Sequence, residues 1–90
     1  GLPNSLHLEQ NYPNPFNPST TISYQLATPS EVKLQVYNLL GKEVAILVNE
    51  FQLSGSQSIT WNASTVPSGI YLYRITAGNV VITKQMVLIK

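Results

Sequence analysis

The chain has no cysteine, no aspartate and few charged residues of any kind. Without cysteine, neither a disulfide framework nor a thiolate metal site can form. Calcium sites on extracellular domains rely on aspartate-rich loops, because the cation needs many oxygen ligands and several charges, so we expect no dedicated calcium site. Five basic and four acidic residues leave a net charge of +1, spread without clusters. This distribution argues against a nucleic-acid partner and against an anionic membrane surface.

Long hydrophobic runs are also missing. No apolar run approaches the ~20 residues of a membrane-spanning helix, so we expect no membrane insertion. The N-terminus does not resemble a signal peptide, and the start at Gly1-Leu2-Pro3 indicates a fragment of a longer protein whose export signal lies elsewhere. Ser, Thr, Asn and Gln together number 30 of the 90 residues. A polar but uncharged surface of this kind suits an extracellular domain.

Catalytic groups are scarce and scattered. General acid–base catalysis needs two carboxylates, or a carboxylate and a histidine, in one cleft. The four glutamates are expected at strand ends or turns, where solvent surrounds them, and His7 precedes the expected fold. We therefore predict that the domain is not an enzyme and needs no cofactor.

Apolar and polar residues alternate through most of the chain. The segments TTISYQL (20–26) and EVKLQVY (31–37) each place their apolar residues on one face, as strands with one dry and one wet face do. The same reasoning predicts further strands at 43–50, 57–61, 70–76 and 80–90. No window has a convincing helical period. We predict an all-β fold, an immunoglobulin-like antiparallel β-sandwich of about seven short strands.

Turn-forming residues separate these strands. Residues 28–30 (Thr-Pro-Ser) predict a turn, and residues 77–79 (Ala-Gly-Asn) predict a hairpin. The longer connectors, 49–57 and 62–69, are expected to cross between the two sheets, and Gly69 ends the second of them.

The stretch NLLGKE interrupts the alternation between two of the expected strands. Gly41 can adopt the positive φ that most residues avoid, so a tight reversal of the chain fits here. Leu39 or Leu40 is expected to cap the end of the hydrophobic core.

Three aromatic residues allow two interpretations. Trp61, Tyr71 and Tyr73 could form a stacking platform for sugar rings, but in a sandwich this small such residues usually build the core. Trp61 ends an alternating strand on its apolar face. Tyr71 follows a Ser-Gly turn and is placed like a corner tyrosine, buried with its hydroxyl bonded to backbone. We favour the core.

The stretch NYPNPFNP combines the prolines of a linker with two aromatic residues. We assign residues 1–8 to a linker and residues 9–90 to the sandwich. Proline holds the chain extended and lacks a donor, asparagine can bond to nearby backbone, and Tyr12 and Phe16 are expected to close the open end of the sandwich. The residues of this stretch are Asn11, Tyr12, Pro13, Asn14, Pro15, Phe16, Asn17 and Pro18.

Four strings of the sequence resemble a known family, in the family's own order. They are LEQNYPNPFNPSTTISYQL, VKLQVYNLLGKEVAILVN, ITWNASTVPSGIYLYRI and TKQMVLIK. Together, from about Leu8 to Lys90, they resemble the type A C-terminal sorting domain of the type IX secretion system. The family is similar in fold to the immunoglobulin-like domain of a flagellar hook-capping protein. Outside residues 11–18, the positions that carry the family motifs are Gly41, Trp61, Gly69, Tyr71 and Tyr73.

The resemblance implies a non-catalytic sorting signal for protein secretion. The expected partners are the type IX translocon, a sortase-like peptidase that removes the domain, and an upstream cargo domain on the same chain. The implied destination is the cell surface or the exterior of a Gram-negative bacterium, reached through the periplasm and across the outer membrane. Two other functions remain open, a carbohydrate-binding or adhesion module and a passive structural spacer.

The last expected strand is the candidate recognition element. As an edge strand with free backbone groups, it could pair with a receptor strand. It could equally be only the last strand of the sheet, with lysines that discourage aggregation. The candidate residues for recognition by the translocon are Lys84, Met86, Val87, Leu88, Ile89 and Lys90.

Overall fold

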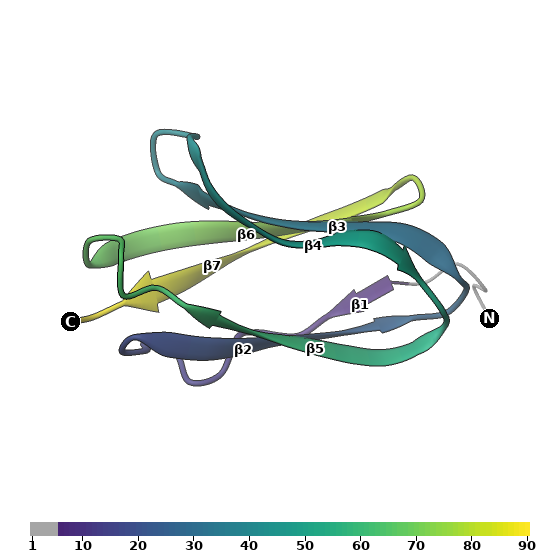
Figure 1. Cartoon of the computed structure of the whole chain (residues 1–90), viewed down its shortest axis with the longest axis horizontal. Coiled ribbons are helices and arrows are strands. Elements are labelled where there is room, and N and C mark those ends of the chain that lie inside the picture. The colour runs from purple at the N-terminus through teal and green to yellow at the C-terminus, as the bar shows by residue number, and fades with distance from the viewer. Residues whose placement is uncertain (1–5) are drawn as a thin grey trace.

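The computed structural model describes residues 6–90, which form seven strands in two antiparallel sheets (Figure 1). The strands are β1 (Leu6–Leu8), β2 (Ser19–Leu26), β3 (Ser30–Asn38), β4 (Glu43–Gln52), β5 (Gly55–Asn62), β6 (Gly69–Ala77) and β7 (Val80–Leu88). One sheet has the order β1-β2-β5 and the other the order β4-β3-β6-β7. The predicted all-β sandwich is confirmed.

The core lies between the sheets because each strand turns its apolar residues inward. Ile22 pairs with Ile59 in the smaller sheet, and Leu34 lies opposite Ile75 in the larger one. Alternation along each strand places every second side chain on the inner face. The largest fully buried side chains are those of Tyr24, Tyr73, Phe16, Ile22, Leu34, Ile75, Met86 and Leu88.

Three connections cross between the sheets. The chain changes sheet between β4 and β5 and again between β5 and β6, as predicted. The long connector expected at 49–57 is wrong, because β4 continues to Gln52 and β5 begins at Gly55, which leaves only residues 53–54 between them. The turn at residues 27–29 is a third crossing, from β2 to β3. Gly78, with φ of 61°, begins the two-residue turn of the β6–β7 hairpin, as a tight hairpin turn requires.

The prediction that residues 1–8 form a linker is wrong for Leu6–Leu8. These residues form β1, where Leu6 pairs with Leu26 and Leu8 with Tyr24. Leu8 belongs to the core, with 4% of its surface exposed. A strand of three residues is too short to show alternation in the sequence, and the neighbouring β2 defines it. The rest of the assigned linker, residues 1–5, lies outside the described residues.

The expected capping of the core by Leu39 or Leu40 is also wrong. These side chains are 64% and 93% exposed. Gly41 adopts φ of 84°, as predicted, and reverses the chain beyond the end of β3. The leucines therefore lie on a hairpin that projects past the sandwich (Figure 1).

Candidate functional site

Residues 11–18, here called the bridging segment, join the edges of the two sheets. Tyr12 forms an antiparallel bridge with Thr21 of β2, and Phe16 forms a parallel bridge with Leu88 of β7. Farther on, the carbonyl of Pro18 accepts the N–H of Ala63 at 2.8 Å. The segment therefore starts on one sheet, contacts the other, and returns to begin β2.

Asn11 is the buried polar centre of this segment, with 2% of its surface exposed. Its Nδ2 donates to the carbonyl of Pro13 at 3.1 Å and to Thr20 Oγ1 at 3.0 Å. Its Oδ1 accepts a hydrogen bond from Gln10 Nε2 at 2.7 Å. Thr20 Oγ1 in turn donates to the carbonyl of Pro13 at 2.9 Å. Each buried polar group thus has a partner, as burial demands.

Tyr73 ties the start of the bridging segment to β6. Its hydroxyl donates to the carbonyl of Glu9 and accepts the N–H of Asn11, each at 2.9 Å. The side chain is fully buried, and this burial raises the pKa of the phenol. The neutral hydroxyl can both donate and accept, whereas a phenolate could only accept. The protonated form therefore holds the two chain segments together.

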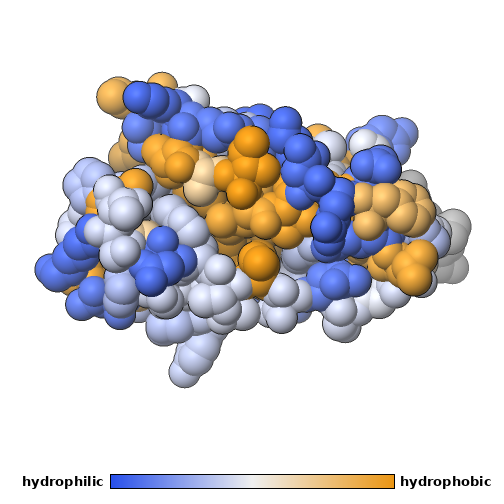
Figure 2. All heavy atoms as spheres, viewed as in Figure 1, coloured by the Kyte–Doolittle hydropathy of each residue, from blue (hydrophilic) through white to orange (hydrophobic). Residues whose placement is uncertain are grey.

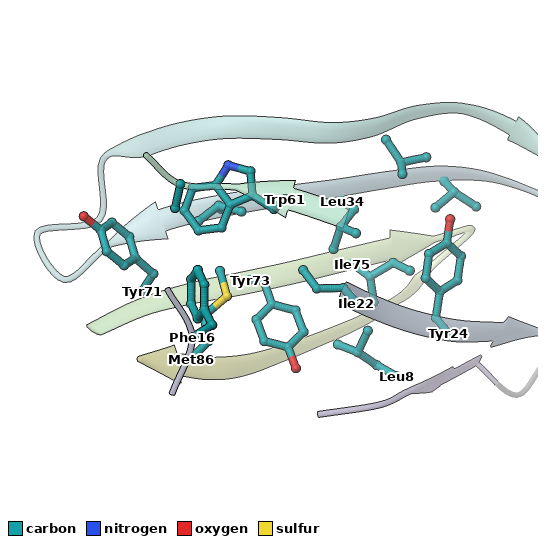
Figure 3. Packing of buried hydrophobic residues seen from close by; sticks show 14 of the residues in the cluster. Leu8, Phe16, Ile22, Tyr24, Leu34, Trp61, Tyr71, Tyr73, Ile75 and Met86 are labelled. Atoms are coloured by element: carbon teal, nitrogen blue, oxygen red, sulfur yellow. The ribbon is translucent and has the colours of Figure 1, made fainter. Parts of the chain in front are cut away.

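Phe16 anchors the other end of the segment in the core. Its ring is 2% exposed and lies 6.0 Å from the ring of Trp61, which lies 5.8 Å from Tyr71 in an edge-on arrangement. Figure 3 shows these three rings at one end of the core, beside Met86. The prediction that Phe16 closes the end of the sandwich is confirmed.

The prediction for Tyr12 is wrong. Its side chain is 80% exposed, although its backbone bonds to Thr21 through both polar groups. The cause is alternation: Asn11 points inward, so its neighbour in the bridge points outward. Bends also replace the extended conformation expected for the prolines at positions 13–15 and 17–18.

The aromatic platform considered for sugar binding does not form. Trp61, Tyr71 and Tyr73 are 8%, 4% and 0% exposed, so none presents a ring face to a sugar. The Tyr71 hydroxyl donates to the carbonyl of Pro67 at 2.6 Å. This is the corner tyrosine that the sequence predicted, and the preferred interpretation of these residues as core is confirmed.

The candidate recognition residues of β7 divide into two groups. Met86 and Leu88 are buried at 0% and 1% exposure, so their side chains belong to the core. Lys84 and Val87 are half-buried, while Ile89 and Lys90 are exposed. The side chains that a partner could reach without unfolding are therefore those of Lys84, Val87, Ile89 and Lys90.

The outer edge of β7 is partly occupied by the bridging segment. The N–H of Phe16 donates to the carbonyl of Val87 at 3.0 Å, and the carbonyl of Phe16 accepts the N–H of Ile89 at 2.9 Å. The N–H of Val87 donates to Asn14 Oδ1 at 2.9 Å. The carbonyl of Gln85 accepts Gln10 Nε2 at 2.8 Å. The edge that was expected to be free is therefore occupied from residue 85 to residue 89.

The first half of the same edge is open. In an antiparallel pair, the groups that point away from the neighbouring strand belong to every second residue. Counting back from Val87 in steps of two gives Gln85, which is already bonded, and then Thr83 and Val81. Among the described residues, no hydrogen bond is made to the outward N–H or carbonyl of Thr83 or Val81. The backbone groups on the outer side of Val81 and Thr83 are therefore free of hydrogen-bond partners within residues 6–90.

The described part of the chain offers little for chemistry. Residues 6–90 contain no group of three or more histidines, cysteines and acidic residues that could hold a metal ion. Their one close contact between a basic and an acidic side chain joins His7 Nε2 to Glu9 Oε2 at 2.7 Å on the surface. No helix in this range is long and apolar enough to span a membrane.

These features define an immunoglobulin-like β-sandwich whose two sheets are joined by a polar, proline-rich segment. The model of the family described as secretion system C-terminal sorting domain matches residues 10–90. The chain belongs to this family, the sorting domains of the type IX secretion system. It therefore acts as a sorting signal, interacts with that secretion machinery, and directs export to the cell surface or the exterior.

A solved structure supports the fold. The domain is similar to part of PorZ, an essential bacterial surface component of the type IX secretion system of Porphyromonas gingivalis, with a TM-score of 0.62 and 20% sequence identity. The match covers 90% of this chain and 11% of PorZ. At this identity the likeness shows the fold alone. A search of curated proteins finds no match.

Proposed function

We propose that the domain carries an upstream cargo domain of the same chain to the type IX translocon, which recognises the end of β7. In this proposal a separate signal brings the protein to the periplasm. The folded domain then accompanies the cargo across the outer membrane of a Gram-negative bacterium. Finally, a sortase-like peptidase separates the two. The domain itself contributes contacts and no catalytic group.

The observation that carries this proposal is the way the bridging segment holds the end of β7. Phe16 and Asn14 together make three hydrogen bonds to Val87 and Ile89. A sorting signal is recognised more tightly when its conformation is fixed, because a preformed surface loses less conformational entropy on binding. The bridging segment supplies that rigidity at the end of the strand.

The six candidate residues then take two roles. Met86 and Leu88 position the strand through the core, and the accessible side chains of Lys84, Val87, Ile89 and Lys90 contact the translocon. Lys90 is itself placed by its neighbours: its N–H donates to Ser68 Oγ at 3.1 Å and its Nζ to the carbonyl of Ser64 at 2.8 Å. These exposed bonds can exchange for bonds to a partner at small cost.

A reporter fusion tests the proposal. A periplasm-targeted fluorescent protein with residues 1–90 at its C-terminus is expressed in a bacterium that has a type IX system. We expect the reporter on the surface or in the medium, whereas the reporter alone stays in the periplasm. Equal retention of both would contradict sorting and would favour a passive spacer.

The peptidase step has its own readout. In a strain whose sortase-like peptidase is inactivated, the exported reporter should keep the domain and migrate about 9.9 kDa larger. In the parent strain it should migrate without the domain. Reporter of the same full size in both strains would show that no such removal occurs.

A further inference from the structure

The hairpin between β3 and β4 ends in a turn that Asn38 holds with four hydrogen bonds. Two of these hydrogen bonds involve the backbone of Asn38, and two involve its side-chain oxygen. Its backbone N–H donates to the carbonyl of Lys42 at 2.9 Å, and its carbonyl accepts the N–H of Gly41 at 3.0 Å. Its Oδ1 accepts the N–H groups of Leu40 and Lys42 at 2.9 and 3.0 Å.

This rigid turn presents two adjacent leucines to solvent. Leu39 is 64% exposed and Leu40 is 93% exposed, and we call residues 38–42 the hairpin tip. Figure 1 shows the tip projecting away from the four-stranded sheet, and Figure 2 shows hydrophobic and hydrophilic atoms side by side on it. Neither leucine contributes to the core. Their exposure therefore adds nothing to the packing of the folded domain.

The tip also carries an unpaired positive charge. Glu43, the nearest carboxylate in the sequence, accepts a hydrogen bond from Gln35 Nε2. Among the described residues the one close contact between a basic and an acidic side chain is that of His7 and Glu9, so Lys42 has no carboxylate partner within them. The tip thus combines two apolar side chains with one free ammonium group.

We propose that the hairpin tip is a second docking element, which inserts Leu39 and Leu40 into an apolar pocket of a protein partner with a carboxylate at its rim. The carboxylate would pair with Lys42, and the pocket would bury the two leucines. Apolar anchors in a partner's pocket carry most of the energy of many interfaces. The rigid turn favours a protein over a lipid surface, because preorganisation improves binding to a shaped pocket.

This docking element uses other residues than the end of β7, and both lie toward the same end of the sandwich, since Asn38 pairs with Tyr71 and Tyr71 with Met86. The tip is formed by β3 and β4, and β6 lies between β3 and β7 in the sheet. The inference rests on the proposed sorting function, in which the partner would belong to the secretion machinery. The residues of the hairpin tip are nevertheless not among those assigned to recognition at the end of β7.

The test compares Leu40→Ser with Leu53→Ser in the reporter fusion. Leu53 is 68% exposed and lies in the connection from β4 to β5, at the other end of β4 from the tip. We expect Leu40→Ser to lower export about tenfold or more, as for loss of an interface anchor, and Leu53→Ser to leave it unchanged. Both domains should keep the wild-type melting temperature, since neither side chain is in the core.

Other results would overturn the inference. If both variants were exported like wild type, or if both were lowered equally, the tip would have no specific partner. If the wild-type domain sedimented with phosphatidylglycerol vesicles and Leu40→Ser did not, the partner would be a membrane surface. If the wild-type fusion stayed in the periplasm, both the sorting function and this inference would be contradicted. If wild type and Leu40→Ser were exported equally, only this inference would be contradicted.

Discussion

Phe16 and Val87, 71 positions apart in the sequence, are joined through their backbones, with the N–H of Phe16 donating to the carbonyl of Val87 at 3.0 Å. The ring of Phe16 is buried against Trp61. One residue of the proline-rich segment therefore fixes the end of β7 and fills the core beneath it. Damage to this segment should disturb the surface that we assign to translocon recognition.

Replacing Phe16 with alanine should destabilise the domain strongly. Removal of a buried aromatic ring leaves a cavity and typically costs about 3–5 kcal/mol of unfolding free energy. Tyr12→Ala is the matched control in the same segment. Because Tyr12 is 80% exposed, its loss should change stability by about 0.5 kcal/mol or less. Urea unfolding measures both, and a loss below about 1 kcal/mol for Phe16→Ala would show that the ring is not buried.

Amide hydrogen exchange should divide the outer edge of β7 into two halves. The N–H groups of Val87 and Ile89 are bonded to the bridging segment and should exchange slowly. Those of Val81 and Thr83 point outward without a partner among residues 6–90 and should exchange almost as in an unfolded chain. Asn14→Ala should speed exchange at Val87 while Val81 stays the same. Uniform protection along the strand would be inconsistent with this arrangement.

The Tyr73 hydroxyl should contribute measurably to stability. Tyr73→Phe removes the partner of a buried N–H and of a part-buried carbonyl, which costs about 1–3 kcal/mol. Tyr37→Phe serves as the control, because the Tyr37 hydroxyl makes only a long, exposed contact of 3.5 Å with Arg74. Guanidinium unfolding of both variants measures the difference. Equal stabilities would mean that water replaces the bonds of Tyr73.

Alkaline pH should destabilise the domain through Tyr24 and Tyr73. Burial raises the pKa of each phenol above the ordinary value of 10.0. Because the raised pKa belongs to the folded state, the stability that these groups contribute is fully present below the unfolded pKa. It is lost as the pH rises through the folded pKa. We expect the unfolding free energy to fall above about pH 10, and to fall less steeply in Tyr24→Phe. The same slope in that variant would assign the loss to other groups.

The strands and their inner faces could be predicted from the sequence because alternation reports burial directly. Residues such as Leu34 and Ile75 lie where the pattern places them. The positive φ of Gly41 and the corner position of Tyr71 were also predicted correctly. Each depends on nearby residues only: the turn at Gly41 needs a residue that tolerates positive φ, and the Tyr71 hydroxyl bonds to the carbonyl of Pro67 four residues earlier.

Features that depend on distant parts of the chain could not be predicted. Asn11 is buried because Tyr73 and Thr20 reach it from other strands, and its neighbours in the sequence give no sign of this. The occupied edge of β7 likewise depends on Asn14 and Phe16. In each case the partner lies across the fold, so the pattern of the segment alone carries no signal.

The most direct test of the account compares two exposed residues of the terminal segment. Val81 lies near the start of β7 and Ile89 directly follows its last residue, and they are 55% and 53% exposed. The reporter fusion is prepared with Ile89→Ser and with Val81→Ser. The backbone bond of Ile89 to Phe16 does not depend on its side chain, so both variants should melt like wild type. We predict that Ile89→Ser lowers export about tenfold, as for an interface anchor, and that Val81→Ser does not. Equal export of the two variants would contradict recognition at the end of β7.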